Sequence, residues 1–256
     1  MIHPLSHRHT MSRLPRPSAH PMRHIAWMAL LLSACGVPSS HANPKGLASW
    51  CVTNGQVSVN NNDWLSITAP SVRMIDPLST TQHVDIKFRY IAPTNDIKPL
   101  ASGELRRQIG LKLLAEDDCN LLYVMWHIHP DSAISVSVKH NTGEKTHAEC
   151  HADGYETLTP HFKYTPPAIH SGEEHQLSAQ IDDTQLSVFA DTQLVWRGDI
   201  GDHIQGMHGH VGLRSDNAQF DVKFLTPSQN DVTTAIETAA TVKQQAENEA
   251  LTCLNH

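Results

Sequence analysis

Apolar and polar residues alternate with a period of two in a series of short segments of this 256-residue chain. Side chains of a β-strand point to opposite faces in turn, so this pattern predicts strands with one buried and one open face. Clusters of Asn, Asp, Pro and Gly separate the segments, as turns require. The segments are 57–59, 65–67, 83–91, 104–114, 121–129, 134–140, 175–181, 185–190, 193–198, 210–215 and 220–224. Many short strands with almost no helix predict an all-β sandwich of two antiparallel sheets.

The composition allows a substantial core and limits the class of partner. Apolar residues make up 39% of the chain and charged residues 18%, which suits one large β domain. The formal net charge of -7 offers no extended basic surface for phosphates, so we expect no nucleic-acid partner. An acidic polymer would need a locally basic groove, such as one containing Arg106, Arg107 and Lys112.

The segment from residue 22 to residue 42 has the order of regions found in a bacterial secretory signal. Arg23 and His24 precede an apolar run at 25–32, which is too short for a permanent membrane span. Small residues follow, with two alternative endings: Leu-Ser-Ala before Cys35 resembles a lipoprotein signal, whereas Ser-His-Ala ending at Ala42 suits ordinary cleavage. The sequence therefore predicts export to the periplasm or outer membrane with a lipid on Cys35, or, as the alternative, a soluble periplasmic or secreted protein.

These patterns divide the chain into three parts. Residues 1–42 form the predicted signal and tether, 43–225 the predicted sandwich, and 226–256 a tail rich in Ala, Thr, Gln and Glu. Apolar residues of the tail recur at roughly helical spacing, which predicts an amphipathic helix at 230–251, the alternative being a frayed tail. The residues in question are Val232, Ile236, Ala239, Val242 and Ala246.

Apart from Cys35, the chain has four cysteines, an even number in a compartment where disulfides persist. Three pairings are open to them. Cys51 and Cys253 lie near the two ends of the mature domain, and chain ends are often close in space. This favours the pairs Cys51–Cys253 and Cys119–Cys150. Zinc binding is not indicated, because no two cysteines have the Cys-x-x-Cys spacing.

The order of the last strands resembles that of concanavalin A-like lectin and glucanase jelly rolls. The runs concerned are Glu-His-Gln-Leu at 174–177, Leu-Ser-Val-Phe-Ala-Asp at 186–191, the Gly-x-x-Gly-Leu strand at 209–217, and Phe-Asp-Val at 220–222. The resemblance covers about 48–225. It implies two antiparallel sheets, one of them curved, with a saccharide site on the concave face of the curved sheet.

A narrower similarity is to alginate lyase-type jelly rolls, in the motifs Arg-Thr-Glu-Leu-Arg, Gln-Ile-His and Tyr-Phe-Lys-x-Gly-x-Tyr-x-Gln. The matching residues are Glu104, Leu105, Arg106, Ile128, His129 and Gly212. The similarity implies that Arg106 neutralises a uronate carboxylate and that His129 acts as a base. The chain departs from the motifs at the first Arg, the Gln and both Tyr positions. Arg214 stands where those lyases carry their proton-transferring Tyr.

Alternation within two neighbouring strands predicts where polar side chains meet. In segment 104–114, one face carries Glu104, Arg106, Gln108 and Lys112; in segment 121–129, one face carries Tyr123, Met125, His127 and His129. Arginine offers a planar fork to carboxylates and histidine titrates near neutral pH, so these faces suit saccharide binding or acid–base chemistry. The predicted binding residues are Glu104, Arg106, Gln108, His127, His129 and Arg214, and the catalytic candidates are Arg106 and His129.

No metal or cofactor is predicted. His127 and His129 could supply two metal ligands, but a zinc site needs a third. The acidic run Glu116-Asp117-Asp118 is expected in a solvated turn, although its oxygens could bind a structural calcium. The paired carboxylates of a glucanase-type Glu-x-Asp-x-x-Glu strand are absent.

The few aromatic residues divide into packing residues and candidate sugar contacts. Trp126 and Trp196 are expected in the core, and Tyr155 and Tyr164 lie in a turn-rich region where a sugar contact is plausible. Together, the sequence predicts an exported jelly roll that binds a glycan or another envelope component without a clear catalytic motif. The alternative is a polysaccharide lyase or glycoside hydrolase acting on an acidic polysaccharide.

Overall fold

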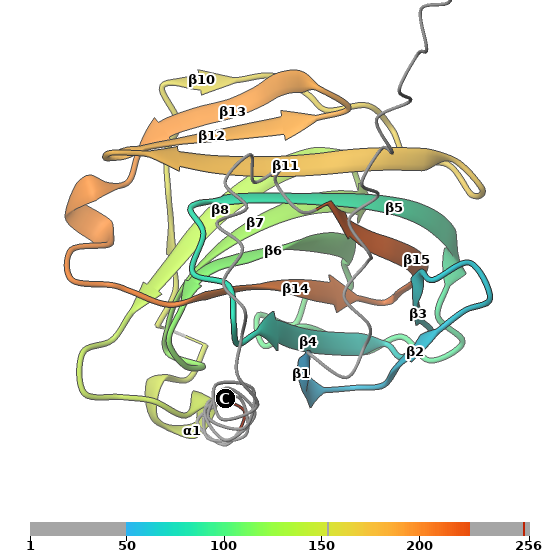
Figure 1. Cartoon of the computed structure of the whole chain (residues 1–256), viewed down its shortest axis with the longest axis horizontal. Coiled ribbons are helices and arrows are strands. Elements are labelled where there is room, and N and C mark those ends of the chain that lie inside the picture. The colour runs from blue at the N-terminus through green and yellow to red at the C-terminus, as the bar shows by residue number, and fades with distance from the viewer. Residues whose placement is uncertain (1–49, 153, 226–252, 254–256) are drawn as a thin grey trace, which may run out of the picture. The chain divides into compact units, whose positions relative to one another are not determined.

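The computed structural model describes residues 50–152, 154–225 and 253 (Figure 1). The predicted signal segment with Cys35 and Ala42, and the predicted tail helix at 230–251, lie outside these residues. The three-part division of the chain therefore stays a prediction.

The described strands form two antiparallel sheets (Figure 1). In spatial order, the seven-stranded sheet consists of β1 (Cys51–Asn54), β4 (Ser71–Asp76), β14 (His210–Asp216), β6 (Arg107–Ala115), β7 (Asn120–His129), β8 (Ala133–His140) and β9 (Glu156–Thr157). The eight-stranded sheet consists of β10 (Phe162–Lys163), β13 (Gln193–Asp199), β12 (Gln185–Ala190), β11 (Glu174–Asp182), β5 (His83–Pro93), β15 (Ala218–Leu225), β3 (Leu65–Ile67) and β2 (Val57–Val59). Two short helices, α1 (His147–Cys150) and η2 (Gly201–His203), lie in connections.

The core lies between the sheets and follows from the alternation in the sequence. On β6, Ile109, Leu111 and Leu113 are fully buried in it. Trp126 of β7 is also fully buried, and its ring meets Phe88 of the other sheet edge-on, with 5.6 Å between centroids. Each such side chain contributes roughly 1.5–3 kcal/mol by leaving water. The expected core positions of Trp126 and Trp196, which is 1% exposed, are confirmed.

The predicted fold class, a two-sheet antiparallel jelly-roll sandwich, is confirmed. The boundaries of the strands differ in two ways. The strand predicted at 104–114 begins at Arg107, so residues 104–106 belong to the preceding loop. Strands β1, β4, β9 and β10 were not predicted: β9 and β10 have only two residues each, and β4 lies between Pro70 and Pro77, which suggested a turn-rich stretch.

Two disulfides join parts of this sandwich, with the predicted pairing. Cys51–Cys253 links the first strand to the end of the chain, and Cys119–Cys150 links the β6–β7 turn to α1, with 5.8 Å between the α-carbons. The second bond fastens the connection between β8 and β9 to the seven-stranded sheet. Within the described residues, no helix has the length and apolar character needed to cross a bilayer.

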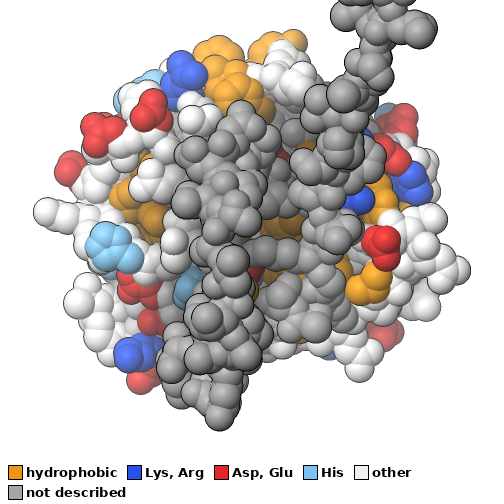
Figure 2. Space-filling model, viewed as in Figure 1, with side chains coloured by type: hydrophobic (Ala, Val, Ile, Leu, Met, Phe, Trp, Pro, Cys, Tyr) orange, Lys and Arg blue, Asp and Glu red, His pale blue; other side chains and the backbone are white. Residues whose placement is uncertain are grey.

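Charged side chains on the visible surface are dispersed. In Figure 2 the coloured Lys, Arg, Asp and Glu side chains alternate with neutral ones around the face shown.

Candidate functional site

The face of the seven-stranded sheet that is turned away from the core carries polar and charged side chains. Gln108 and Lys112 of β6 alternate with the core residues of that strand. The strand register places Gln108 between Asp216 of β14 and His127 of β7, and it places Lys112 between Gly212 and Tyr123. The same alternation that builds the core thus builds a second, polar row of side chains.

Two adjoining cavities lie against this face, and we call them together the cleft. The first has a volume of about 510 Å³ and is lined by Asn54, Gly55, Ala69, Pro70, Ser71, Arg73, Lys98, Pro99, Leu100, Ala101, Asp118, Tyr123, His147, Tyr155, Arg214 and Asp216. The second has a volume of about 310 Å³ and is lined by Leu100, Ala101, Ser102, Glu104, Arg106, Gln108, Met125, His127, Ser135, Ser137, Ala152, Tyr155, Thr157 and Arg214. Four residues line both cavities, so the two meet at Leu100, Ala101, Tyr155 and Arg214.

The loop between β5 and β6 forms one wall of the cleft, and Asn217 holds it in place. The side chain of this buried residue accepts a hydrogen bond from the Lys98 amide at 2.8 Å. It also donates to the carbonyls of Lys98 and Arg106, at 2.8 and 2.9 Å. Asn217 occupies the left-handed region, with φ of 57°, which Asn tolerates better than most residues. One turn residue therefore fixes both ends of the segment 98–106.

Asp216 is the centre of the first cavity's charge network. Its carboxylate accepts hydrogen bonds from Arg73 Nη2 at 2.8 Å, Arg214 Nε at 2.9 Å and Gln108 Nε2 at 2.7 Å. Burial raises the pKa of Asp216, but the guanidinium groups of Arg214 and Arg73 outweigh this and hold the pKa below its ordinary value. The carboxylate is therefore ionised at neutral pH, and it orients side chains from three strands.

Arg106 and His127 meet in the second cavity. Arg106 Nη2 pairs with Glu104 Oε2 at 2.6 Å, and its Nη1 lies 3.5 Å from His127 Nε2. The same nitrogen of His127 lies 2.8 Å from Ser135 Oγ. Burial, reinforced by the charge of Arg106, lowers the pKa of His127 to about 4. The ring is therefore neutral at pH 7, and the single lone pair of Nε2 can accept a hydrogen bond from the nearer neighbour, Ser135 Oγ.

Tyr155 stands where the two cavities meet. Its ring stacks on Tyr123 with 6.0 Å between centroids, and Lys139 Nζ lies 4.8 Å from its centroid. Its hydroxyl lies 3.4 Å from Arg214 Nη1, and burial raises the pKa of Tyr155 to about 12. Tyr155 thus presents a protonated hydroxyl to the cleft, while its ring is engaged with neighbouring side chains.

Lys112 lies at the base of this network. It is fully buried, and Nζ has no hydrogen-bond partner among the described residues. Burial lowers the pKa of Lys112 to about 8; Asp118 opposes this, while Arg73 and Arg214 add to it. A buried amine without a partner is costly, so its presence calls for an explanation.

Five of the six predicted binding residues line the cleft; His129 does not. Glu104 and Arg106 line the cleft from the loop before β6 and not from the strand itself. The prediction that strand alternation places them there was therefore wrong. His129 lies exposed at the end of β7 opposite Arg107, where the register shifts before the pair Gln108–His127. The sequence missed Arg73 and Asn217, although the alternation of Arg73 with its apolar neighbours in β4 was a usable signal.

No group of three or more His, Cys, Asp or Glu side chains able to hold a metal ion occurs within the described residues. In the acidic run, both Asp117 oxygens accept hydrogen bonds from the Asn120 side chain, and one also accepts from the Cys119 amide. The carboxylate of Asp117 is thereby committed to the turn. Calcium binding at this run stays a prediction.

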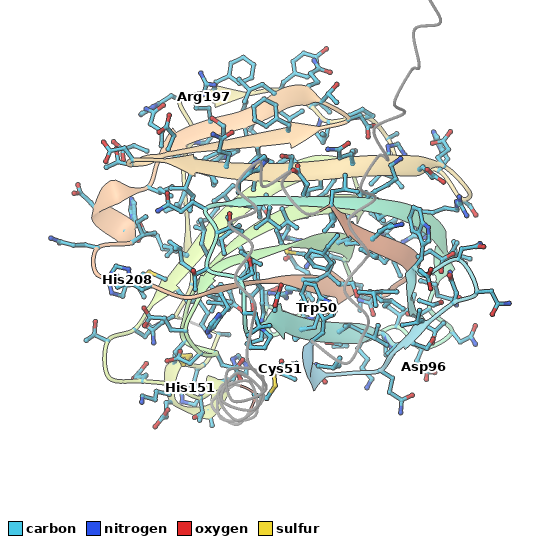
Figure 3. The ribbon with its side chains drawn as sticks, viewed as in Figure 1. Trp50, Cys51, Asp96, His151, Arg197 and His208 are labelled. Carbon is cyan, nitrogen blue, oxygen red and sulfur yellow. A yellow bond between two sulfur atoms is a disulfide. The ribbon has the colours of Figure 1, made fainter. Side chains whose placement is uncertain are left out.

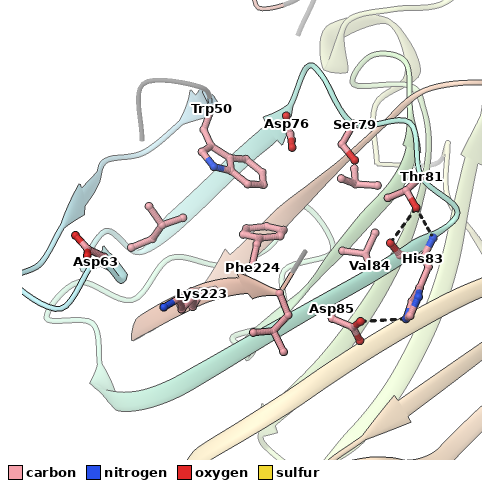
Figure 4. Close-up of a pocket in the computed structure, with 14 residues that line it drawn as sticks. Trp50, Asp63, Asp76, Ser79, Thr81, His83, Val84, Asp85, Lys223 and Phe224 are labelled. Carbon is pink, nitrogen blue, oxygen red and sulfur yellow. Dashed lines mark hydrogen bonds and ion pairs between the residues drawn. The ribbon is translucent and has the colours of Figure 1, made fainter. Parts of the chain in front are cut away.

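A third, smaller cavity lies apart from the cleft, between the sheets (Figure 4). The rings of Trp50 and Phe224 lie 4.1 Å apart in its wall, and His83 and Asp85 pair at its rim with 3.0 Å between Nε2 and Oδ2. Its volume of about 70 Å³ holds only a few water molecules, given roughly 30 Å³ for each in the liquid. It is too small for a sugar chain.

Comparison with known proteins gives structural likeness only. No protein-family model matches the chain, and no curated protein matches its sequence. Among solved structures, the carbohydrate-binding module CBM66 from Bacillus subtilis is 11% identical, covering 68% of this chain and 91% of that one, with a TM-score of 0.49. The metal-free Emp46p carbohydrate recognition domain is 13% identical over 70% of this chain and 88% of that one, with a TM-score of 0.43. Sheep galectin-11 is 11% identical over 67% and 98%, with a TM-score of 0.37.

The substitution Lys112→Met tests whether the buried amine costs stability. The pKa of Lys112 falls from 10.5 to about 8 on folding, so between these values the unfolded chain holds a proton that the folded chain has released. Stability therefore rises with pH across this window. At about pH 7 the variant should gain up to about 3 kcal/mol in free energy of unfolding, at roughly 1.4 kcal/mol per pKa unit. The gain should shrink as the pH approaches 10.5.

Urea denaturation at several pH values measures this gain. The control is Lys87→Met, whose side chain is 42% exposed and whose substitution should produce no gain of this kind. A loss of stability in Lys112→Met at pH 7 would show that the ammonium group has a stabilising partner.

Proposed function

We propose that this chain is an exported cell-envelope protein that binds a glycan in the cleft. The supporting observation is the set of hydrogen-bonding side chains from neighbouring strands that line the cleft and already hold one another in place. Arg106 is fixed by Glu104, and Arg214 by Asp216. Polar groups held in this way bind hydroxyl-rich ligands without losing much side-chain entropy, and they discriminate between hydrogen-bonding patterns.

The cleft favours binding over cleavage. A general base works best with a pKa near the working pH, whereas the pKa of His127 is about 4 and that of Tyr155 about 12. Neither group exchanges a proton readily at pH 7. Asp216 accepts three hydrogen bonds, and Glu104 is paired with Arg106, so neither carboxylate is free to act as the acid or nucleophile of a glycosidase. The lyase or hydrolase alternative therefore has less support.

Substitution of Arg106 tests glycan binding at the cleft. We expect the mature protein to bind at least one polysaccharide saturably on a glycan array and in isothermal titration calorimetry. Arg106→Ala should weaken that binding about tenfold or more, because a charge-assisted hydrogen bond contributes roughly 1.5–3 kcal/mol.

The matched control is Arg197→Ala, which removes an exposed arginine of β13. Arg197 lies at the edge of the molecule opposite Cys51 and His151 (Figure 3) and lines neither cavity of the cleft. It should bind as the unchanged protein does. Equal weakening in both variants, or no saturable binding to any polysaccharide, would overturn the proposal.

The second part of the proposal concerns the cellular location of the protein. The two disulfides support an oxidising compartment, since such bonds persist outside the cytosol. We propose that a lipid on Cys35 anchors the mature chain to the envelope membrane, with cleavage after Ala42 as the alternative.

Mass spectrometry of the mature protein distinguishes the two endings. The anchor predicts a mature chain that begins at a diacylated Cys35 and partitions into detergent, and Cys35→Ala should abolish both properties. An unmodified amino terminus at Asn43 would exclude the anchor and leave export in place.

A further inference from the structure

Three cationic side chains gather on adjacent strands beneath the first cavity. Arg73 lies directly opposite Arg214 across the β4–β14 pair, and Lys112 lies opposite Gly212, two residues from Arg214 on the same face. Because Gly212 has no side chain, none separates Lys112 from Arg214 at this position of β14. Asp216 is the carboxylate in direct contact with the two arginines. The cluster thus has more positive than negative charge, although the whole chain has a net charge of -7.

Lys112 shows that this excess is not neutralised within the described residues. Its amine is fully buried without a hydrogen-bond partner, and the charges of Arg73 and Arg214 oppose its own. Asp118, which lines the first cavity, is the carboxylate that favours the charged form. An apolar side chain at this position would avoid the cost of burying an amine. A bound negative group in the first cavity would offset it.

The side chain of Gln108 indicates that a ligand bound in the cleft also donates a hydrogen bond. Its Nε2 donates to Asp216, but its buried Oε1 has no partner among the described residues. Gln108 lines the second cavity, next to the first. A buried amide oxygen without a donor is an unmet acceptor. A hydroxyl group of a ligand can donate to it.

We propose that the glycan of the proposed function is acidic, with a carboxylate, sulfate or phosphate group bound at Arg73 and Arg214 above Lys112, and a hydroxyl group donating to Gln108. This inference rests on the proposed function and specifies its ligand class. Arg214 can take part because its Nη2 has no described partner, while its Nε is bonded to Asp216. Arg73 Nη1 already donates to the carbonyls of Val72 and Ser215, so Arg73 contributes mainly its positive charge, and Arg214 supplies the direct hydrogen bond to the oxyanion.

Calorimetry with matched polymers tests the charge requirement. The probes are polygalacturonate and alginate, the same two polymers after reduction of their carboxyl groups to alcohols, and neutral dextran. Dextran sulfate and a teichoic acid distinguish sulfate and phosphate from carboxylate. We expect at least one acidic polymer to bind ten times more tightly than its reduced or neutral counterpart, and added NaCl to weaken that binding.

The variant Lys112→Met tests whether the preference for an acidic polymer depends on the cluster of Arg73, Lys112 and Arg214. It should weaken binding of the acidic polymer at least fivefold and leave binding of neutral polymers unchanged. Because the same variant is expected to fold more stably, unfolding does not account for the loss. The control is Lys87→Met on the other sheet, which removes one positive charge outside the cleft and should bind as the unchanged protein does.

The outcomes separate this inference from the proposed function. Equal affinity for acidic and reduced polymers would overturn the acidic ligand and leave glycan binding intact. Full affinity of Lys112→Met for an acidic polymer would overturn the role of the cluster. Absence of binding to every polymer would overturn the proposed function, and the acidic ligand with it.

Discussion

The carboxylate of Asp216 is the contact on which the cleft depends. It is buried, and it binds side chains from three neighbouring strands: Arg73 of β4, Arg214 of β14 and Gln108 of β6. Removing one partner from such a network leaves an uncompensated buried charge, whereas the intact network fixes register and direction. The next residue, Asn217, fastens the loop that forms the wall of the cleft. Two consecutive residues thus set both the base and the wall.

The network also bears on the proposal that the cleft recognises a ligand. Asp216 pairs with Arg73 and Arg214, and the ring of His127 stays neutral at pH 7 because burial and the charge of Arg106 lower its pKa to about 4. Lys112 is the exception, a buried amine that the described residues leave without a partner. A residue that lowers the stability of the folded protein is often retained because the function needs it. Lys112 is therefore the most informative position of the site.

The sequence predicted the fold well because its period-two alternation specifies which face of each strand is buried. The same alternation correctly assigned Trp126 to the core and Gln108 to the opposite face. It failed where the strand ended: Arg106 reaches the cleft from a loop, and His129 lies beyond the shift in register, so counting by two no longer applied. The bond of Asn217 to Lys98 spans 119 residues, and no local pattern contains such a contact. The disulfide pairs could be chosen because chain ends tend to meet.

We expect the ligand to bind on the outer face of the seven-stranded sheet. A crystal structure of the mature protein with a bound acidic oligosaccharide tests it most directly. We predict that the sugar lies against Tyr155 where the two cavities meet, with an oxyanion at Arg73 and Arg214 and a hydroxyl at Gln108. A sugar seated on the eight-stranded sheet, beside Arg197 or the exposed ring of Tyr164, with the cleft unchanged, would contradict it.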